Sequence, residues 1–192
     1  MTRLSFGLFL LPLISLHAND PILLAHRGLL RHAPENTLPA FATCLELGMG
    51  LELDIRTTKD GKLVVLHDAT LVRTTNGPNR HLSEFTWKQL QKFDAGSWFD
   101  SRFTGVRVPS LEETFALVKE RKRRPSLLAL NVKGITREGE KELVRLLGKF
   151  KLFKESFAFD QSDECSERLK ALDPRIRIGR NVRREEIDSR LA

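Results

Sequence analysis

Five residues that could move protons or hold charge fall in three short stretches. His26 and Arg27 end the run LLAHRG, Glu52 and Asp54 alternate in LELDI, and His67 follows VVL. Imidazoles titrate near neutral pH, and carboxylate oxygens suit Ca²⁺ or Mg²⁺ better than zinc. Hydrolysis of a phosphodiester needs charge neutralisation, a base that activates a nucleophile and an acid for the leaving alkoxide. The set therefore predicts phosphodiester chemistry.

The hydrophobic pattern predicts alternating strands and helices that would bring these residues together. Short apolar runs predict six strands, over 21–25, 51–55, 63–66, 127–132, 156–159 and 176–178. Capped or amphipathic segments predict helices over 37–48, 110–120, 138–150 and 164–172. This alternation indicates an α/β fold with mostly parallel strands, whose carboxyl ends share one rim.

The second strand is predicted to present two acids on one face. In LELDI, Glu52 and Asp54 share a face opposite the leucines and isoleucine. A turn at Asp60-Gly61 is too short for a crossover helix, so antiparallel pairing would set Asp54 about opposite His67. Taken alone, the two acids could also be the solvent face of an edge strand.

Length and composition predict one soluble domain preceded by a leader. The 192 residues are 41% hydrophobic and 30% charged, with a formal net charge of +7. Arg3, an apolar stretch over 4–16 and Ala18 resemble a secretory signal peptide over 1–18, with a buried N-terminal helix as the alternative. We expect a domain over 19–192 in a secreted or periplasmic protein, with no transmembrane segment in the mature chain.

Charge and cysteine usage restrict the partners. The basic cluster over 119–124, KERKRR, has no interleaved aromatic residues, so we expect a solvated helix end and no nucleic acid. Cys44 and Cys165 lack metal-ligand spacing and are expected to remain unpaired. The oligomeric state is left open.

Several longer motifs resemble one family. HRG, PENTLPAF, LELDIRTTKDGKLVVLHDATLVRTTNG, DAGSWF and VPSLEETF resemble the glycerophosphodiester phosphodiesterase family in order and spacing. The resemblance is strong over 23–133 and looser over 156–180. It implies a TIM-type barrel with one divalent metal, Ca²⁺ or Mg²⁺, that hydrolyses glycerophosphodiesters to an alcohol and sn-glycerol 3-phosphate.

The resemblance also assigns roles by position. His26 and His67 match the acid/base pair, and Glu52 and Asp54 match metal ligands. The substrate-binding positions are Arg27 and Lys133, which match phosphate contacts, and Glu35 and Asn36, which match a motif that braces the site as much as it touches substrate.

Two features depart from the family pattern. Asn131 stands where the family has a third carboxylate, so the metal site, if Asn131 is a ligand rather than a bystander, carries one negative charge fewer. The strand pattern stops after about six strands in a charged tail over 183–190, whereas a closed barrel needs eight, so we expect an incomplete barrel.

These departures leave alternatives. One is a weakly active or non-catalytic phosphate-binding remnant of the family. Another is a related phosphodiesterase that acts on lysophospholipid or sphingomyelin head groups. The identity of the base and that of the nucleophile, either water or the substrate's own hydroxyl, are not decided by the sequence.

Overall fold

A computed structural model describes residues 23–121, 126–160 and 163–180. Its sheet contains five strands: β1 (Leu24–His26), β2 (Gly50–Thr57), β3 (Leu63–Val65), β4 (Leu128–Val132) and β5 (Ser156–Phe159). The order is β1-β2-β4-β5 with parallel neighbours, and β3 pairs antiparallel with the end of β2. The predicted α/β fold with a mostly parallel sheet is confirmed.

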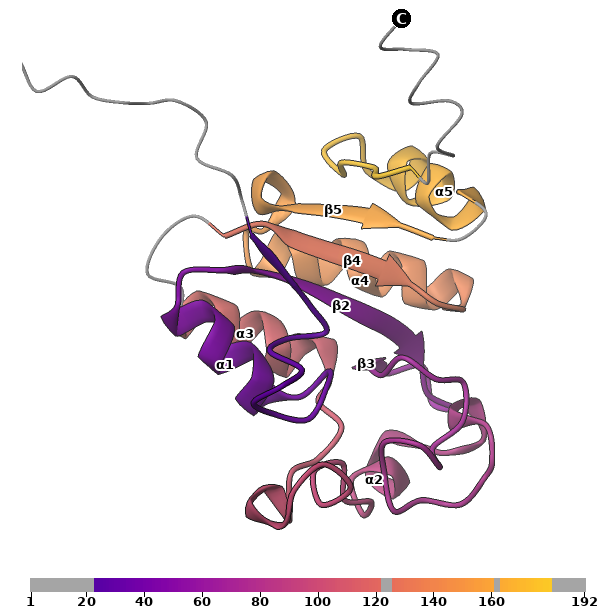
Figure 1. Cartoon of the computed structure of the whole chain (residues 1–192). Coiled ribbons are helices and arrows are strands. Elements are labelled where there is room, and N and C mark those ends of the chain that lie inside the picture. Colours follow the sequence, from indigo (N-terminus) through magenta and orange to yellow (C-terminus); the bar gives the residue numbers. More distant parts are fainter. Residues whose placement is uncertain (1–22, 122–125, 161–162, 181–192) are drawn as a thin grey trace, which may run out of the picture.

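Helices cover one face of this sheet (Figure 1). The longer ones are α1 (Leu38–Glu46), α3 (Leu111–Arg121), α4 (Arg137–Lys149) and α5 (Glu164–Leu172). Leu51, Leu53 and Ile55 on β2 join the main core with residues from all four helices, as the alternation in LELDI predicts. Glu52 and Asp54 therefore point to the opposite face, towards which no described helix packs.

Two strand predictions need correction. The run expected as a sixth strand contributes only an isolated parallel bridge between Ile178 and Ala158. Ile55 pairs with Val65, so Leu66, and not His67, comes opposite Asp54. The reason is that the connection between Thr57 and Leu63 has an odd number of residues, which centres the hairpin on Asp60 itself.

The segment between β3 and α3 forms a second, smaller core that the sequence pattern does not reveal. It contains only short helices: η1 (Leu82–Glu84), α2 (Trp87–Leu90) and η2 (Ser101–Phe103). Seven buried residues of this segment, among them Leu71, Leu82 and Leu90, cluster with Val64 of β3. The smaller core anchors the chain that leaves β3 through His67. Outside this segment, one more short helix, η3 (Phe153–Glu155), precedes β5.

Other sequence predictions concern the cysteines, the leader and the tail. Cys44 and Cys165 are buried and free, as expected. The signal peptide predicted over 1–18 and the charged tail over 183–190 lie outside the described residues. Among the helices that are described, none combines the length and hydropathy needed to cross a bilayer.

Candidate active site

The loop after β1 is held against the acids of β2. Arg27 adopts a left-handed φ of 56°, and its backbone N–H donates to the Glu52 carbonyl at 3.0 Å and to Glu52 Oε2 at 3.1 Å. His26 Nε2 lies 3.9 Å from the same Oε2, and the His26 side chain is 62% exposed. The first predicted histidine is thus accessible and adjacent to a predicted metal ligand.

Asn36, in the motif PENTLPAF, braces Asp54. Its Nδ2 donates to Asp54 Oδ2 at 2.8 Å, while the Asp54 backbone N–H donates to Asn36 Oδ1 at 3.3 Å. The Asn36 backbone N–H, in a residue with φ of 55°, donates to the Arg27 carbonyl at 2.9 Å. Because both amide atoms are engaged with a buried aspartate, the geometry supports the bracing part of the predicted role of Asn36.

The two acids are buried and interact electrostatically. Glu52 is 8% exposed and Asp54 is fully buried. Burial, followed by the negative charge of Asp54, raises the pKa of Glu52 above its ordinary value. Asn131 Nδ2 donates to Asp54 Oδ1 at 3.1 Å, which brings the third predicted ligand to the pair from β4. A solvent-exposed edge strand, the alternative interpretation of LELDI, is ruled out by this burial.

Two cations face Asp54. Arg27 Nε lies 3.4 Å from Asp54 Oδ2, and Lys133 Nζ lies 3.7 Å from Asp54 Oδ1. Arg27 Nε is buried and has no hydrogen-bond partner among the described residues. The Asp54 carboxylate compensates the charge of Arg27 without accepting a hydrogen bond from Nε, so this N–H can still donate to an anionic oxygen of a ligand. Both predicted phosphate contacts therefore lie beside Asp54.

His67 is held through both its ring and its backbone. Its Nδ1 lies 2.6 Å from Asp68 Oδ1, and a carboxylate at that distance selects the tautomer with the proton on Nδ1. Arg56 Nε and Nη2 donate to the His67 carbonyl at 2.9 and 2.7 Å, and Arg56 Nη1 donates to the Lys133 carbonyl at 3.0 Å. The Nε2 atom of His67 is left to act on a substrate.

Glu35, predicted to bind substrate or brace the site, is held by two arginines. It accepts from Arg27 Nη1 at 3.3 Å and from both terminal nitrogens of Arg73, at 2.9 and 2.8 Å. Burial raises the pKa of Glu35, but the hydrogen bonds from Arg73 and the charges of both arginines outweigh it and lower the pKa overall. Glu35 is therefore an ionised link between the loop after β1 and a more distant arginine.

Sequence reasoning missed two polar residues of this region. Arg56 and Arg73 contact predicted site residues, yet neither follows a parallel strand end or has a ligand-like spacing. Asp68 is found with His67 among the polar residues at the strand ends, but the sequence assigns it no role of its own. Arg73 is 38 residues from Glu35 in sequence, so only the fold brings the two together.

The donor set suits a hard divalent cation. Glu52, Asp54 and Asn131 offer carboxylate and amide oxygens, which Ca²⁺ and Mg²⁺ prefer, and a half-turn of the Asn131 amide exchanges its nitrogen for its oxygen. A cation would also relieve the repulsion that raises the pKa of Glu52. Within the described residues, no cluster of three or more His, Cys, Asp or Glu side chains is placed to hold a metal.

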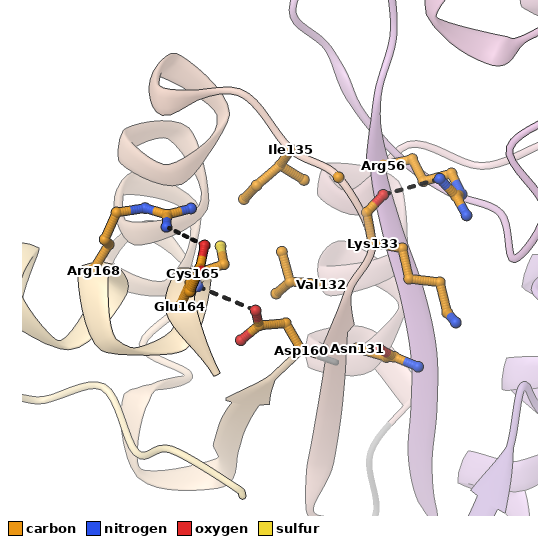
Figure 2. A pocket seen from close by; sticks show the side chains of 10 residues that line it. Arg56, Asn131, Val132, Lys133, Ile135, Asp160, Glu164, Cys165 and Arg168 are labelled. Carbon is orange, nitrogen blue, oxygen red and sulfur yellow. Dashed lines mark hydrogen bonds and ion pairs between the residues drawn. The ribbon is translucent and has the colours of Figure 1, made fainter. Parts of the chain in front are cut away.

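A polar cavity adjoins the site (Figure 2). It has a volume of about 400 Å³ and lies between the ends of β4 and β5 and the start of α5. Figure 2 shows Asn131 and Lys133 directed to one side of β4 and Val132 directed to the other. Asn131 and Lys133 line the cavity and also contact Asp54.

The sequence profile of the glycerophosphoryl diester phosphodiesterase family matches residues 26–173, which include every residue of this site. The chain belongs to the glycerophosphoryl diester phosphodiesterase family. A glycerophosphodiester phosphodiesterase from Caldanaerobacter subterraneus is 37% identical over 163 residues, covering 82% of this chain and 65% of that protein. The family resemblance noted from the motifs is confirmed.

Solved members of the family share the fold. A glycerophosphodiester phosphodiesterase from Agrobacterium tumefaciens superposes with a TM-score of 0.75 at 32% identity, covering 83% of this chain and 66% of that one. An Oleispira antarctica phosphodiesterase, in complex with the product sn-glycerol-3-phosphate, gives 0.70 at 28% identity, covering 84% of this chain and 66% of that one. The described sheet is thus part of the TIM-type barrel of this family, and the chain spans about two thirds of these relatives.

Proposed function

We propose that this chain hydrolyses glycerophosphodiesters to an alcohol and sn-glycerol 3-phosphate. The observation that carries the proposal is the placement of two histidines along one edge of β2, beside a buried pair of acids. His26 lies next to Glu52, and His67 follows the residue paired with Asp54. Proton donors and acceptors are thereby available at a centre that also offers anion-binding cations.

The protein's own residues would divide the work. Arg27 and Lys133 would bind the non-bridging phosphate oxygens, because their nitrogens lie beside Asp54 and Arg27 Nε makes no hydrogen bond within the described residues. His26 and His67 would exchange the protons, one as base and the other as acid. A nucleophile from water or from the substrate's neighbouring hydroxyl is compatible with either assignment.

A divalent cation is part of this proposal. Glu52, Asp54 and Asn131 would hold it, and when bound it would neutralise phosphate charge and lower the pKa of an attacking hydroxyl or water. Asn131 supplies a neutral ligand where a carboxylate would add charge, so affinity for the cation is expected to be modest.

A second candidate function is phosphate binding without turnover. It is favoured by the neutral Asn131, which donates to Asp54 at the position where the family has a third carboxylate. This candidate predicts binding of inorganic phosphate or glycerol 3-phosphate without release of product from a diester.

We also propose that the protein is exported. The support is the order of charge, apolar stretch and small residue over 1–18, in a segment outside the described residues. Expression of the full chain with N-terminal sequencing of the periplasmic or secreted product tests this. Cleavage after Ala18 is the expected result, and retention of Met1 in the cytoplasmic fraction contradicts it.

The activity is tested by release of glycerol 3-phosphate from glycerophosphocholine, with Mg²⁺ or Ca²⁺ and with a chelator. We expect release that depends on the cation and is lost in His67→Ala. The matched control is His32→Ala, because His32 is exposed and, within the described residues, its side chain makes no hydrogen bond or ion pair with a residue of the site. Folded, cation-loaded protein that releases nothing would contradict the proposed hydrolase, and chelator-resistant release would contradict the role of the cation.

A further inference from the structure

Arg73 joins two of the loops that carry predicted site residues. Its Nε donates to Asp68 Oδ2 at 2.6 Å, and its Nη2 donates to Asp68 Oδ1 at 2.9 Å. The same guanidinium donates from Nη1 and Nη2 to the two oxygens of Glu35, at 2.9 and 2.8 Å. One planar group therefore binds two carboxylates, each through both of its oxygens.

Each carboxylate has a second partner inside the site. Asp68 Oδ1 also lies 2.6 Å from Nδ1 of His67. Glu35 Oε1 also accepts from Arg27 Nη1 at 3.3 Å. A continuous chain of charge-assisted contacts thus runs from the imidazole of His67 through Asp68, Arg73 and Glu35 to the predicted phosphate contact Arg27.

Stability alone is a poor reason for this arrangement. The side chain of Arg73 is 43% exposed and that of Asp68 is 24% exposed, and ion pairs that reach solvent contribute little to stability. The arrangement instead fixes the positions of the two carboxylates. A guanidinium fork has fixed directions, so it sets where each carboxylate lies in a way that a flexible ammonium does not.

We propose that Arg73 is a positioning residue that fixes Asp68, so that Asp68 holds Nδ1–H of His67 and leaves Nε2 for the substrate. The proposal rests on the proposed function for the acid/base role of His67. Without Arg73, Asp68 and Glu35 would lose the cation between them and repel each other across the gap. Asp68 could then turn to solvent, and the His67 ring would lose the contact that selects its tautomer.

The hydrogen bonds of Arg73 support an effect on both loops. Its side chain has donors on three nitrogens, all of which are used on Asp68 and Glu35. Lysine at this position would keep the positive charge but would donate hydrogen bonds from one nitrogen instead of three. The variants Arg73→Met and Arg73→Lys therefore separate the loss of charge from the loss of fork geometry.

The test uses the full chain and two independent readouts. The first is ¹⁵N NMR of the histidine ring nitrogens at about pH 8.5, where an ordinary imidazole is neutral, with His67 assigned from His67→Ala. The second is steady-state release of glycerol 3-phosphate. Arg102→Met is the matched control, because Arg102 pairs only with Asp100 in the part of the chain that the structure describes, and its side chain is 80% exposed.

We expect Nδ1–H of His67 in the wild type and in Arg102→Met, and a mixture of both tautomers in the two Arg73 variants. We expect kcat to fall roughly 10- to 100-fold in both Arg73 variants while KM changes less than about threefold. If Arg73→Met does not fold by circular dichroism, Arg73→Lys carries the test. An unchanged tautomer in a folded Arg73 variant would overturn the proposal, as would an equal fall in kcat in Arg102→Met.

The two readouts separate this proposal from the proposed function. A wild type that releases no product contradicts the hydrolase, while the ring-nitrogen signals still decide whether Arg73 controls His67. If the wild type is active and Arg73→Lys matches it in both kcat and the His67 tautomer, the proposed hydrolase stands. The positioning role of Arg73 is then contradicted.

Discussion

At the scale of single residues, Asp54 is the centre around which the site is arranged. It is fully buried, its two oxygens accept from Asn36 and Asn131, and the nitrogens of Arg27 and Lys133 lie within 3.7 Å of it. A buried carboxylate needs such partners, because an ionised group without them is costly to bury. Asn131 is the neutral partner, at the position where the sequence resemblance predicts a carboxylate, and its replacement by glutamate would add a charge while keeping a side-chain oxygen.

Asn131→Glu is expected to tighten binding of Mg²⁺ or Ca²⁺ by roughly tenfold, because it adds a negative charge to the ligand set. Isothermal titration calorimetry of the full chain measures this. Asn131→Gln is the control, since it has the length of glutamate without the charge, and its affinity should not rise. Equal affinities of wild type and Asn131→Glu would place Asn131 outside the metal site.

At the scale of elements, two loops beside the strands carry Arg27 and His67 and owe their shape to the elements packed against them. The loop after β1 packs against α1 so closely that a Cβ on Gly28 would lie 2.6 Å from Cβ of Ala40. Gly28 also has a φ of +92°, which side chains disfavour. The position of Arg27 therefore depends on the absence of a side chain at the next residue.

Gly28→Ala is expected to reduce the free energy of unfolding by about 2 to 5 kcal/mol, because it adds a steric clash to an unfavourable φ. Gly61→Ala is the matched control: Gly61 has a φ of +81°, but no atom lies within 4 Å of the place that its Cβ would take, so we expect a loss of about 1 kcal/mol. Urea unfolding of both variants provides the comparison. Equal losses would show that the contact with Ala40 relaxes without cost.

Glu112 joins three elements and gives the fold a pH dependence. Its carboxylate contacts Lys149 on α4 at 2.6 Å and Lys62 before β3 at 2.9 Å, and these hydrogen bonds, with that of Lys149 first, lower the pKa of Glu112 to about 2. A lowered pKa in the folded state means that the stabilisation is present above the ordinary value of 4.5 and is lost as the pH falls towards 2.

Glu112→Gln should therefore lower the Tm at pH 7, by an amount equivalent to about 1 kcal/mol, since the group is partly exposed and screened. The difference from the wild type should shrink steadily between pH 4.5 and the acid limit of folding. Differential scanning calorimetry across this range measures it. A difference that is constant with pH would assign the effect to packing rather than to charge.

At the scale of the whole molecule, the described residues form two apolar cores that support different parts of the site. The main core lies between the sheet and its helices, and the smaller core lies under the segment that follows β3. His67, Asp68 and Arg73 belong to that segment, whereas His26 and the acids of β2 belong to the sheet itself. The two halves of the predicted acid/base pair thus depend on different packing.

Leu71→Ala tests this division, because Leu71 is fully buried in the smaller core and lies in sequence between Asp68 and Arg73. We expect it to cost about 2 to 5 kcal/mol of stability and to lower kcat by roughly tenfold or more, since the loop is displaced. Leu169→Ala, in the main core on α5, should cost a similar amount of stability with little effect on kcat. Equal effects on kcat would show that the two cores act as one.

The sequence by itself determined the α/β pattern, the family and the pair of acids on β2. Those features are written in local spacing: alternation in a strand, caps and apolar periods in helices, and motifs of a few residues. The structure confirms α5 over Glu164–Leu172 and places α1, α3 and α4 within a few residues of their predicted bounds. Local patterns suffice to predict helices and strands because the buried residues repeat about every 3.6 positions in a helix and every second position in a strand.

Only the tertiary structure decided which distant residues meet. The odd-numbered β2–β3 connection set the register at Leu66 instead of His67, the second core formed without long regular elements, and Arg73 reached Glu35 across 38 residues. None of these has a local signal, because a side chain's partner across a loop depends on how the chain folds back and not on its neighbours in sequence. The residues predicted to do the chemistry could therefore be named from the sequence, while the side chains that hold them in place became visible only in the fold.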